Sequence, residues 1–334
     1  MSNYPSILSW LRVKDSEKLQ CWTTRLCVSS KMKSLETLAD IYCSEELTQR
    51  LHQQIICLSV INTLLAISAI AGNIAILNAL PKAISLHRPS KALLRNLVVS
   101  DLCVGFAALV LVVKWICMLQ KRSQICRFFF VAHNMGSFTL ISVSLWILTA
   151  ISVDRLLALM LGLRYRQVVT LRRVYAFTAA VWVQKGVGYP ILAMLDIDAA
   201  QIVAVSSITV CLVTSFFCYT RMYFKLRNQK IHVKNKPPEQ KNNKIPLNIS
   251  RYRKTVGTSL SLQLALLLCY LPYLLLAQFA YGQIEKTQSL DFYLPLYSTV
   301  TLMFFNSSLN PILYCWKNKE VRRAVEDTLR CRRM

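Results

Sequence analysis

Seven long apolar segments, joined by short polar connections, constrain this chain more than any other feature. Each approaches or exceeds the length of about 20 residues that an α-helix needs to cross a bilayer. Hydrophobic residues make up 54% of the sequence and charged residues only 17%, a composition typical of a membrane protein. The sequence therefore predicts an all-α membrane protein, built as a bundle of seven transmembrane helices. The segments cover residues 54–80, 92–119, 128–158, 174–195, 199–224, 256–281 and 290–315.

These segments divide a single domain into three parts. We expect residues 1–53 to form an extracellular N-terminal segment, 54–315 the transmembrane bundle, and 316–334 a cytoplasmic amphipathic helix with a short tail. The first part lacks the apolar core of a signal peptide, so we expect the first span to direct its own insertion. No internal repeat stands out in the sequence.

The net charge of +24 would suit a nucleic-acid-binding protein, but the distribution of the charge argues against one. Basic residues gather in four segments, near 82–95, 155–173, 221–254 and 317–333, whereas the connections between them also carry acids. By the positive-inside rule the basic segments lie in the cytoplasm. We therefore expect a multi-pass protein of the plasma membrane, with its N-terminus outside the cell and its C-terminus in the cytoplasm. We interpret the basicity as orientation and attraction to anionic membrane lipid.

Asp101 is an acid in the middle of the second apolar segment. A carboxylate there needs hydrogen-bond partners or a cation, and oxygen ligands around a carboxylate suit a hard cation such as sodium. The alternative is a neutral, hydrogen-bonded Asp101 that only fastens helices together. As ligands of a possible sodium ion we propose Asp101, Ser144, Asn306 and Asn310; Asn73 and Ser307 are further polar neighbours.

Asp154 and Arg155 end the third apolar segment, and two prolines interrupt later ones. Arginine is always charged and can exchange one partner for another, which fits a switch; a surface ion pair of little energetic weight is the alternative. Pro272, close to Tyr270, and Pro311, after Asn310, each predict a kink. An ordinary transmembrane kink is the alternative to a hinge.

Taken in order, these motifs resemble the rhodopsin-like (class A) G-protein-coupled receptors over residues 54–331. Within that family the resemblance is greatest to the melanocortin, cannabinoid and adenosine group. The stretch 163–170 looks like the second cytoplasmic loop of melanocortin receptors, and 316–323 like the family's membrane-lying eighth helix. The matching residues are Gly72, Asn73, Asn96, Leu97, Asp101, Asp154, Arg155, Trp182, Tyr219, Cys269, Pro272, Asn310, Pro311 and Tyr314.

The resemblance implies a receptor, not an enzyme, that transmits an extracellular ligand signal to heterotrimeric G proteins. It also makes Cys331 a palmitoylation candidate, with an unmodified cysteine as the alternative. Tyr252 stands where many members carry an acid facing the arginine, so we expect a weakened inactive state. The implied switch residues are Asp154, Arg155, Leu163, Tyr219, Asn310, Pro311 and Tyr314, with a hinge at Tyr270 and Pro272.

Two other functions remain open from the sequence. One is a degenerate receptor that does not signal and acts as a homo- or heterodimer partner or as a scaffold, suggested by Tyr270 and Leu266 in place of the family's usual aromatics. The other is a transporter with Asp101 and Lys185 along its path, which the order of the motifs disfavours.

Few residues in the sequence indicate the class of the ligand. Ser137 stands where amine receptors keep an aspartate, and Leu111, Phe130 and Asn134 replace the acids of melanocortin receptors. We therefore favour a small-molecule or lipid-like ligand. Buried lysine is costly in a bilayer; we expect Lys114 to snorkel to the surface. The candidate pocket residues are Lys114, His133, Asn134, Ser137, Phe138, Gln278 and Phe304.

The disulfide common in the family has no direct counterpart. Phe130 occupies the matching position in the third span, and the short outer connection after the fourth span has no cysteine. Cys126 lies one turn earlier and faces an oxidising compartment. Its possible partners are Cys117, Cys21, Cys27 and Cys43, among which spacing does not choose.

Overall fold

The computed structural model describes residues 39–82, 87–234, 265–277, 292–317 and 319–331, and in these ranges the regular structure is entirely helical. The prediction of an all-α membrane bundle is confirmed. The helices are α3 (Glu45–Arg50), α4 (His52–Ala79), η1 (Leu80–Lys82), α5 (Arg88–Leu119), α6 (Ser123–Leu161), η2 (Gly162–Arg164), α7 (Tyr165–Val168), α8 (Leu171–Val183), the π-helical η3 (Gln184–Gly188), α9 (Tyr189–Leu195), α10 (Ile197–Lys234), Ala265–Ala277, α12 (Tyr293–Lys317) and α13 (Lys319–Cys331).

Every one of the seven predicted spans contains a helix. Four helices of the described chain are long and apolar enough to cross a membrane. The fourth predicted span is a helix broken by the π-helical turn η3 between α8 and α9. The sixth is described only over Ala265–Ala277, which is apolar, and the seventh is the 25-residue α12.

Local signals account for several helix ends. Pro89 occupies the first turn of α5, where its missing N–H costs nothing. Ser44 caps α3 by accepting from the backbone N–H of Leu47 at 3.3 Å. Helix α6 ends at Leu161, and the next residue, Gly162, has a φ of 54°, which glycine adopts without a steric cost.

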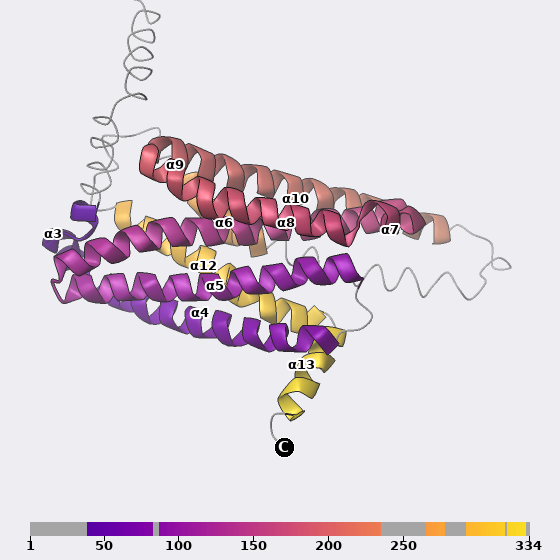
Figure 1. The fold of residues 1–334 in the computed structure, drawn as a ribbon, viewed down its shortest axis with the longest axis horizontal. Coiled ribbons are helices and arrows are strands. Elements are labelled where there is room, and N and C mark those ends of the chain that lie inside the picture. The colour runs from indigo at the N-terminus through magenta and orange to yellow at the C-terminus, as the bar shows by residue number, and fades with distance from the viewer. Residues whose placement is uncertain (1–38, 83–86, 235–264, 278–291, 318, 332–334) are drawn as a thin grey trace, which may run out of the picture.

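The long helices lie side by side, and α5 is the central one, packed against α4, α6, α8 and α12 (Figure 1). We call the end of the bundle next to α3 the disulfide end, and the end next to α7 the arginine end, after the groups described below. Helix α13 leaves the bundle at the arginine end (Figure 1).

Apolar side chains also cover the outside of the bundle, in contrast to a water-soluble protein. Such a surface is stable only against lipid, because water would have to hydrate it. Polar side chains instead gather inside, where they must find partners. Among the most exposed large apolar residues are Leu64, Phe128, Val183, Val213, Leu268 and Leu275.

Candidate functional site

Asp101 ties three helices together in the middle of the bundle. Its carboxylate is fully buried and accepts hydrogen bonds from Ser144 of α6 at 2.6 Å, from Ser307 of α12 at 2.9 Å, and from the amide of Asn310 at 2.7 Å. Three donors can stabilise a buried carboxylate without an ion. The hydroxyl oxygens of the two serines keep lone pairs that a cation could use.

The predicted sodium ligands are only partly assembled. Asp101 and Ser144 are joined, and Ser307 completes an oxygen set that fits a hard cation. Asn310, however, turns its NH₂ group toward the carboxylate, and Asn306 is buried nearby in α12 without a hydrogen bond to Asp101. The residues that fit sodium are therefore Asp101, Ser144 and Ser307.

Pro311 sits inside α12, and two residues of α4 accommodate it. Proline has no N–H, so the carbonyl of Ser307, four residues earlier, loses its helical donor. The amide of Asn73 donates to that carbonyl at 3.3 Å. A side chain on Gly72 would meet the proline ring at 2.8 Å, so only glycine lets α4 approach this closely.

Asp154 at the arginine end is held by other helices more closely than by its neighbour. It accepts from the hydroxyl of Tyr165 in α7 at 2.6 Å and from Ser90 of α5 at 2.9 Å. Its distance to Nε of Arg155 is 3.9 Å, and the arginine side chain is 33% exposed. Arg155 is thus only loosely paired.

Tyr165 is a residue that sequence reasoning missed. Burial, followed by the hydrogen bond to Asp154, raises the pKa of this phenol to about 12, so it remains a donor at neutral pH. The resemblance of stretch 163–170 to a receptor loop pointed to this region. It did not indicate the long-range contact, because the chain turns back through η2 between the two residues.

The other predicted switch residues do not meet Arg155 in this structure. The hydroxyl of Tyr219 shares a hydrogen bond of 2.8 Å with Ser152. Tyr314 is buried, and its hydroxyl has no partner in the part of the chain that the structure describes. Leu163 lies in η2, with its side chain undescribed, and Tyr252 falls outside the described residues.

The predicted hinge lies within the helix Ala265–Ala277. Tyr270 is buried at 1% exposure. One turn on, the hydroxyl of Tyr273 accepts from Gln201 of α10 at 3.2 Å, and its ring lies 5.9 Å from that of Phe138. The residues around Pro272 therefore connect this helix with α6 and α10.

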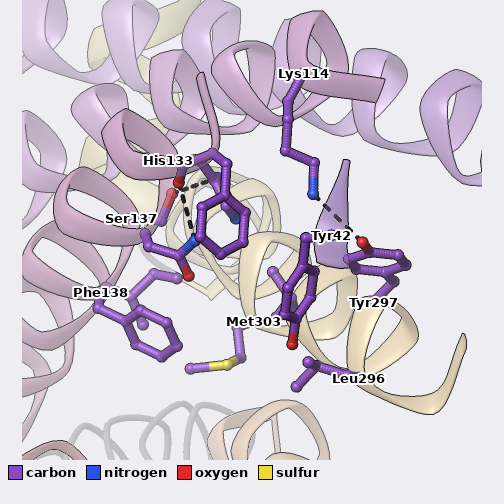
Figure 2. A pocket seen from close by; sticks show the side chains of 12 residues that line it. Tyr42, Lys114, His133, Ser137, Phe138, Leu296, Tyr297 and Met303 are labelled. Atoms are coloured by element: carbon purple, nitrogen blue, oxygen red, sulfur yellow. Dashed lines mark hydrogen bonds between the residues drawn. The ribbon is translucent and has the colours of Figure 1, made fainter. Parts of the chain in front are cut away.

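A cavity of about 50 Å³ lies near the disulfide end, since Tyr42 and Phe130 of its lining are close to Cys43 and Cys126 in the chain. Figure 2 shows the side chains that line it. It contains five of the predicted pocket residues. Phe304 is not in its lining, although its ring lies 6.1 Å from His133, and Gln278 falls outside the described residues. The lining residues are Tyr42, Lys114, Phe130, His133, Asn134, Ser137, Phe138, Ile141, Leu296, Tyr297, Val300 and Met303.

The segment before α4 is attached to the start of α6. Cys43 forms a disulfide with Cys126, and Asp40 pairs with Arg127 at 2.6 Å. The alternative bridge to Cys117 is not formed, because that cysteine is a buried free thiol. The attachment places Tyr42 over the cavity, a contact that sequence reasoning missed.

Both intramembrane lysines are buried. The expectation that Lys114 snorkels is wrong: it is 1% exposed and donates to the hydroxyl of Tyr297 at 3.4 Å. Lys185 lies in the π-helical turn, donates to Ser207 at 3.0 Å, and sits 5.8 Å from the ring of Trp146.

The chain is similar in sequence to known 7 transmembrane receptors. The sequence model of the 7 transmembrane receptors of the rhodopsin family matches residues 72–211 and 197–314. Melanocortin receptor 5 of Mus musculus is 25% identical over 285 residues, which is 80% of this chain and 82% of that receptor. Melanocortin receptor 5 of Homo sapiens is 25% identical over 288 residues, with the same shares covered.

Proposed function

Because this chain belongs to the rhodopsin family of 7 transmembrane receptors, we propose that it transmits the binding of an extracellular ligand to a heterotrimeric G protein. The predicted resemblance to melanocortin receptors is confirmed by the relatives. The chain is accordingly a multi-pass membrane receptor and not an enzyme.

The loosely paired Arg155 is the observation that carries the proposal. Asp154 already accepts two short hydrogen bonds from Tyr165 and Ser90, so it holds the arginine only at 3.9 Å. A guanidinium donates in a rigid fork and exchanges partners readily. In our proposal Arg155 leaves Asp154 with little cost and contacts the G protein.

We place the arginine end in the cytoplasm for two independent reasons. It carries a cluster of basic residues, as the positive-inside rule requires of a cytoplasmic face. The opposite end carries the disulfide, which forms in an oxidising compartment. The basic residues at the arginine end include Arg155, Arg164, Arg166, Arg172 and Arg173.

The network around Asp101 lies between the two ends and is the proposed path of coupling. It joins α5, α6 and α12, and the kink at Pro311 directly follows Asn310. A sodium ion held by Asp101, Ser144 and Ser307 would neutralise the carboxylate. A movement of α12 would change the hydrogen bonds to Asp101 from Ser307 and Asn310.

The cavity at the disulfide end is the proposed ligand site. It is lined by apolar and aromatic side chains with a few polar groups, as small-molecule sites are. Its volume of about 50 Å³ is far below the several hundred Å³ (roughly 300–1,000) of typical ligand pockets. A ligand must therefore enlarge it, and displacement of Tyr42 is the simplest route.

Ligand-free activation across a panel of G-protein families tests the proposal. Wild type, Arg155→Ala and Arg95→Ala are compared at equal surface expression; Arg95 is an exposed arginine of α5 that bonds only Tyr175 among described residues. We expect basal signal through one family in wild type and in the control, and its loss in Arg155→Ala. If none of the three proteins gives a basal signal through any G-protein family, the proposed weak pairing of Arg155 with Asp154 is contradicted. That result would favour a non-signalling dimer partner or scaffold.

A further inference from the structure

We propose that the cavity binds a compact oxyanion group of its ligand, a carboxylate or a phosphate, with Lys114 as the countercharge and Tyr42 as the side chain that closes the site. The inference rests on the proposed function only in taking the cavity as the ligand site.

Lys114 has fewer hydrogen-bond partners than its ammonium requires. An ammonium has three N–H donors, and the one acceptor found among the described residues is the hydroxyl of Tyr297, at 3.4 Å. No carboxylate of the described chain forms an ion pair with it. The other two donors have no acceptor among the described residues, and the ammonium lies in the lining of the cavity (Figure 2).

Aromatic rings surround the ammonium and recover part of its lost hydration. Their centroids lie 4.7 to 5.9 Å from Nζ, the nearest being that of Tyr297. Cation–π contacts stabilise a desolvated ammonium but supply no lone pair for the remaining N–H groups. An oxyanion would supply both the charge and the lone pairs. The rings belong to Tyr42, Trp115, Phe130 and Tyr297.

The rest of the lining favours an anion with an apolar body. Lys114 is the one charged residue of the lining apart from the titratable His133, and no acid of the described chain lines the cavity. His133 and Ser137 share a hydrogen bond of 2.9 Å, and Asn134 donates to the carbonyl of Phe130. The remaining wall is apolar, which suits a hydrocarbon chain. Its residues include Phe138, Ile141, Leu296, Val300 and Met303.

Tyr42 closes this site from the segment before α4. Its ring lies 4.9 Å from that of Phe130 and 4.8 Å from that of Tyr293. The adjacent Cys43 is bonded to Cys126 of α6, so the tyrosine is tethered at the cavity mouth. The cavity of about 50 Å³ accommodates a small polar group, since a water needs about 10–15 Å³ in the same measure. A ligand with a longer chain must move Tyr42.

Binding to the purified full-length receptor, without G protein, tests the proposal. Octanoate and octyl phosphate are the probes that carry both a hydrocarbon tail and an oxyanion. Octylamine carries the same tail with a positive charge, and 1-octanol carries it without a charge. Acetate and inorganic phosphate are oxyanions without a long tail. We expect octanoate or octyl phosphate to raise the melting temperature of wild type. In Lys114→Met its dissociation constant should rise about 30-fold or more, the effect of truncating one partner of a buried charge pair.

Two variants serve as controls. Lys185→Met removes another buried lysine, outside the cavity, and should keep the wild-type affinity. Tyr42→Ala keeps Lys114 and should tighten binding of the tailed anions, because the mouth is open. If Lys114→Met fails to fold, Lys114→Arg and Tyr42→Ala still report on the site, and both should retain oxyanion binding.

The binding results distinguish a free anion from a lipid-like one and show whether Lys114 holds it. Stabilisation by acetate or phosphate equal to that by the tailed probes would identify a free anion, and stabilisation by the tailed probes alone a lipid-like one. Equal affinity in wild type and Lys114→Met, equal binding of octylamine, or no binding of any oxyanion would overturn the proposal. A receptor that binds these anions but gives no G-protein signal would refute the proposed coupling and leave this inference intact.

Discussion

Gly72 and Asn73 show at the scale of single residues how a helix accepts a proline in its neighbour. The missing side chain makes room for the ring of Pro311, and the next side chain supplies the hydrogen bond that the proline removes. One position without the other would leave either a steric clash or a buried carbonyl without a donor. The dipeptide therefore acts as a unit.

We predict that Gly72→Ala lowers stability by about 1–3 kcal/mol, the usual cost of overpacking, because the new Cβ would lie 2.8 Å from the rigid proline ring. Thermal unfolding of the purified receptor measures the change. Gly136→Ala is the matched control, since a Cβ there has open space and alanine favours a helix. A melting temperature of Gly72→Ala at or above that of the control would contradict the prediction.

Tyr165→Phe tests the arrangement at Asp154. Loss of the phenol leaves one carboxylate oxygen without its donor at 2.6 Å, and Arg155 is the nearest cation that can replace it. We expect the arginine to be held more tightly and basal G-protein signalling to fall severalfold, since a hydrogen bond to a charged group contributes about 1.5–3 kcal/mol.

The readout is ligand-free signalling at equal surface expression. Tyr175→Phe removes a hydroxyl that, among the described residues, donates to no carboxylate and only accepts from the exposed Arg95, and should leave the signal unchanged. Unchanged or increased signalling in Tyr165→Phe would show that the tyrosine does not compete with Arg155 for Asp154.

At the scale of elements, the segment Ala39–Leu51 is part of the receptor core and not a free extension. Leu47 of α3 is fully buried, the disulfide fixes the segment to α6, and Tyr42 reaches the cavity. The fourth span is not one regular α-helix, because a π-helical turn interrupts it at Lys185. Such turns often occur at functional sites.

We expect Cys43→Ser, Cys126→Ser and the double variant to lose similar amounts of stability, about 2–5 kcal/mol, because all three remove the same bridge. Thermal unfolding and the binding of tailed anions are the measurements. Cys57→Ser replaces an exposed free thiol and should change neither. A double variant that loses the sum of the two single losses would show that the cysteines act separately.

At the scale of the whole molecule, Asp101 joins α5 to both α6 and α12 through hydrogen bonds from Ser144, Ser307 and Asn310. Helices that converge on one carboxylate can respond together to its charge, which is the condition for coupling between distant sites. A cation bound there would favour the arrangement that the structure shows.

We predict that wild type unfolds at a higher temperature in sodium chloride than in choline chloride at equal ionic strength. Stabilisation by about 1.4 kcal/mol is expected at ten times the dissociation constant. Asp101→Asn should abolish the difference, whereas Asp154→Asn, which alters a buried acid outside this network, should retain it. Equal sodium effects in wild type and Asp101→Asn would remove the cation from the mechanism.

The sequence alone determined the bundle and the central network. An apolar run of bilayer length can satisfy its backbone only as a helix, so segments such as 92–119 and 128–158 could be identified without tertiary information. A carboxylate in such a segment must find polar partners, and Ser144 and Asn310 were available from the other spans. The family resemblance followed from the order of the same residues.

Only the tertiary structure decided which residues meet across the chain. Cys126 had several possible partners in the sequence, and its bridge to Cys43 depends on how the N-terminal segment folds back over α6. The same fold brings Tyr42 close to Lys114, which is buried at 1% exposure. Tyr165 reaches Asp154 because the chain reverses after Gly162. Sequence patterns report which face or depth a residue occupies, whereas contacts between distant segments depend on their packing.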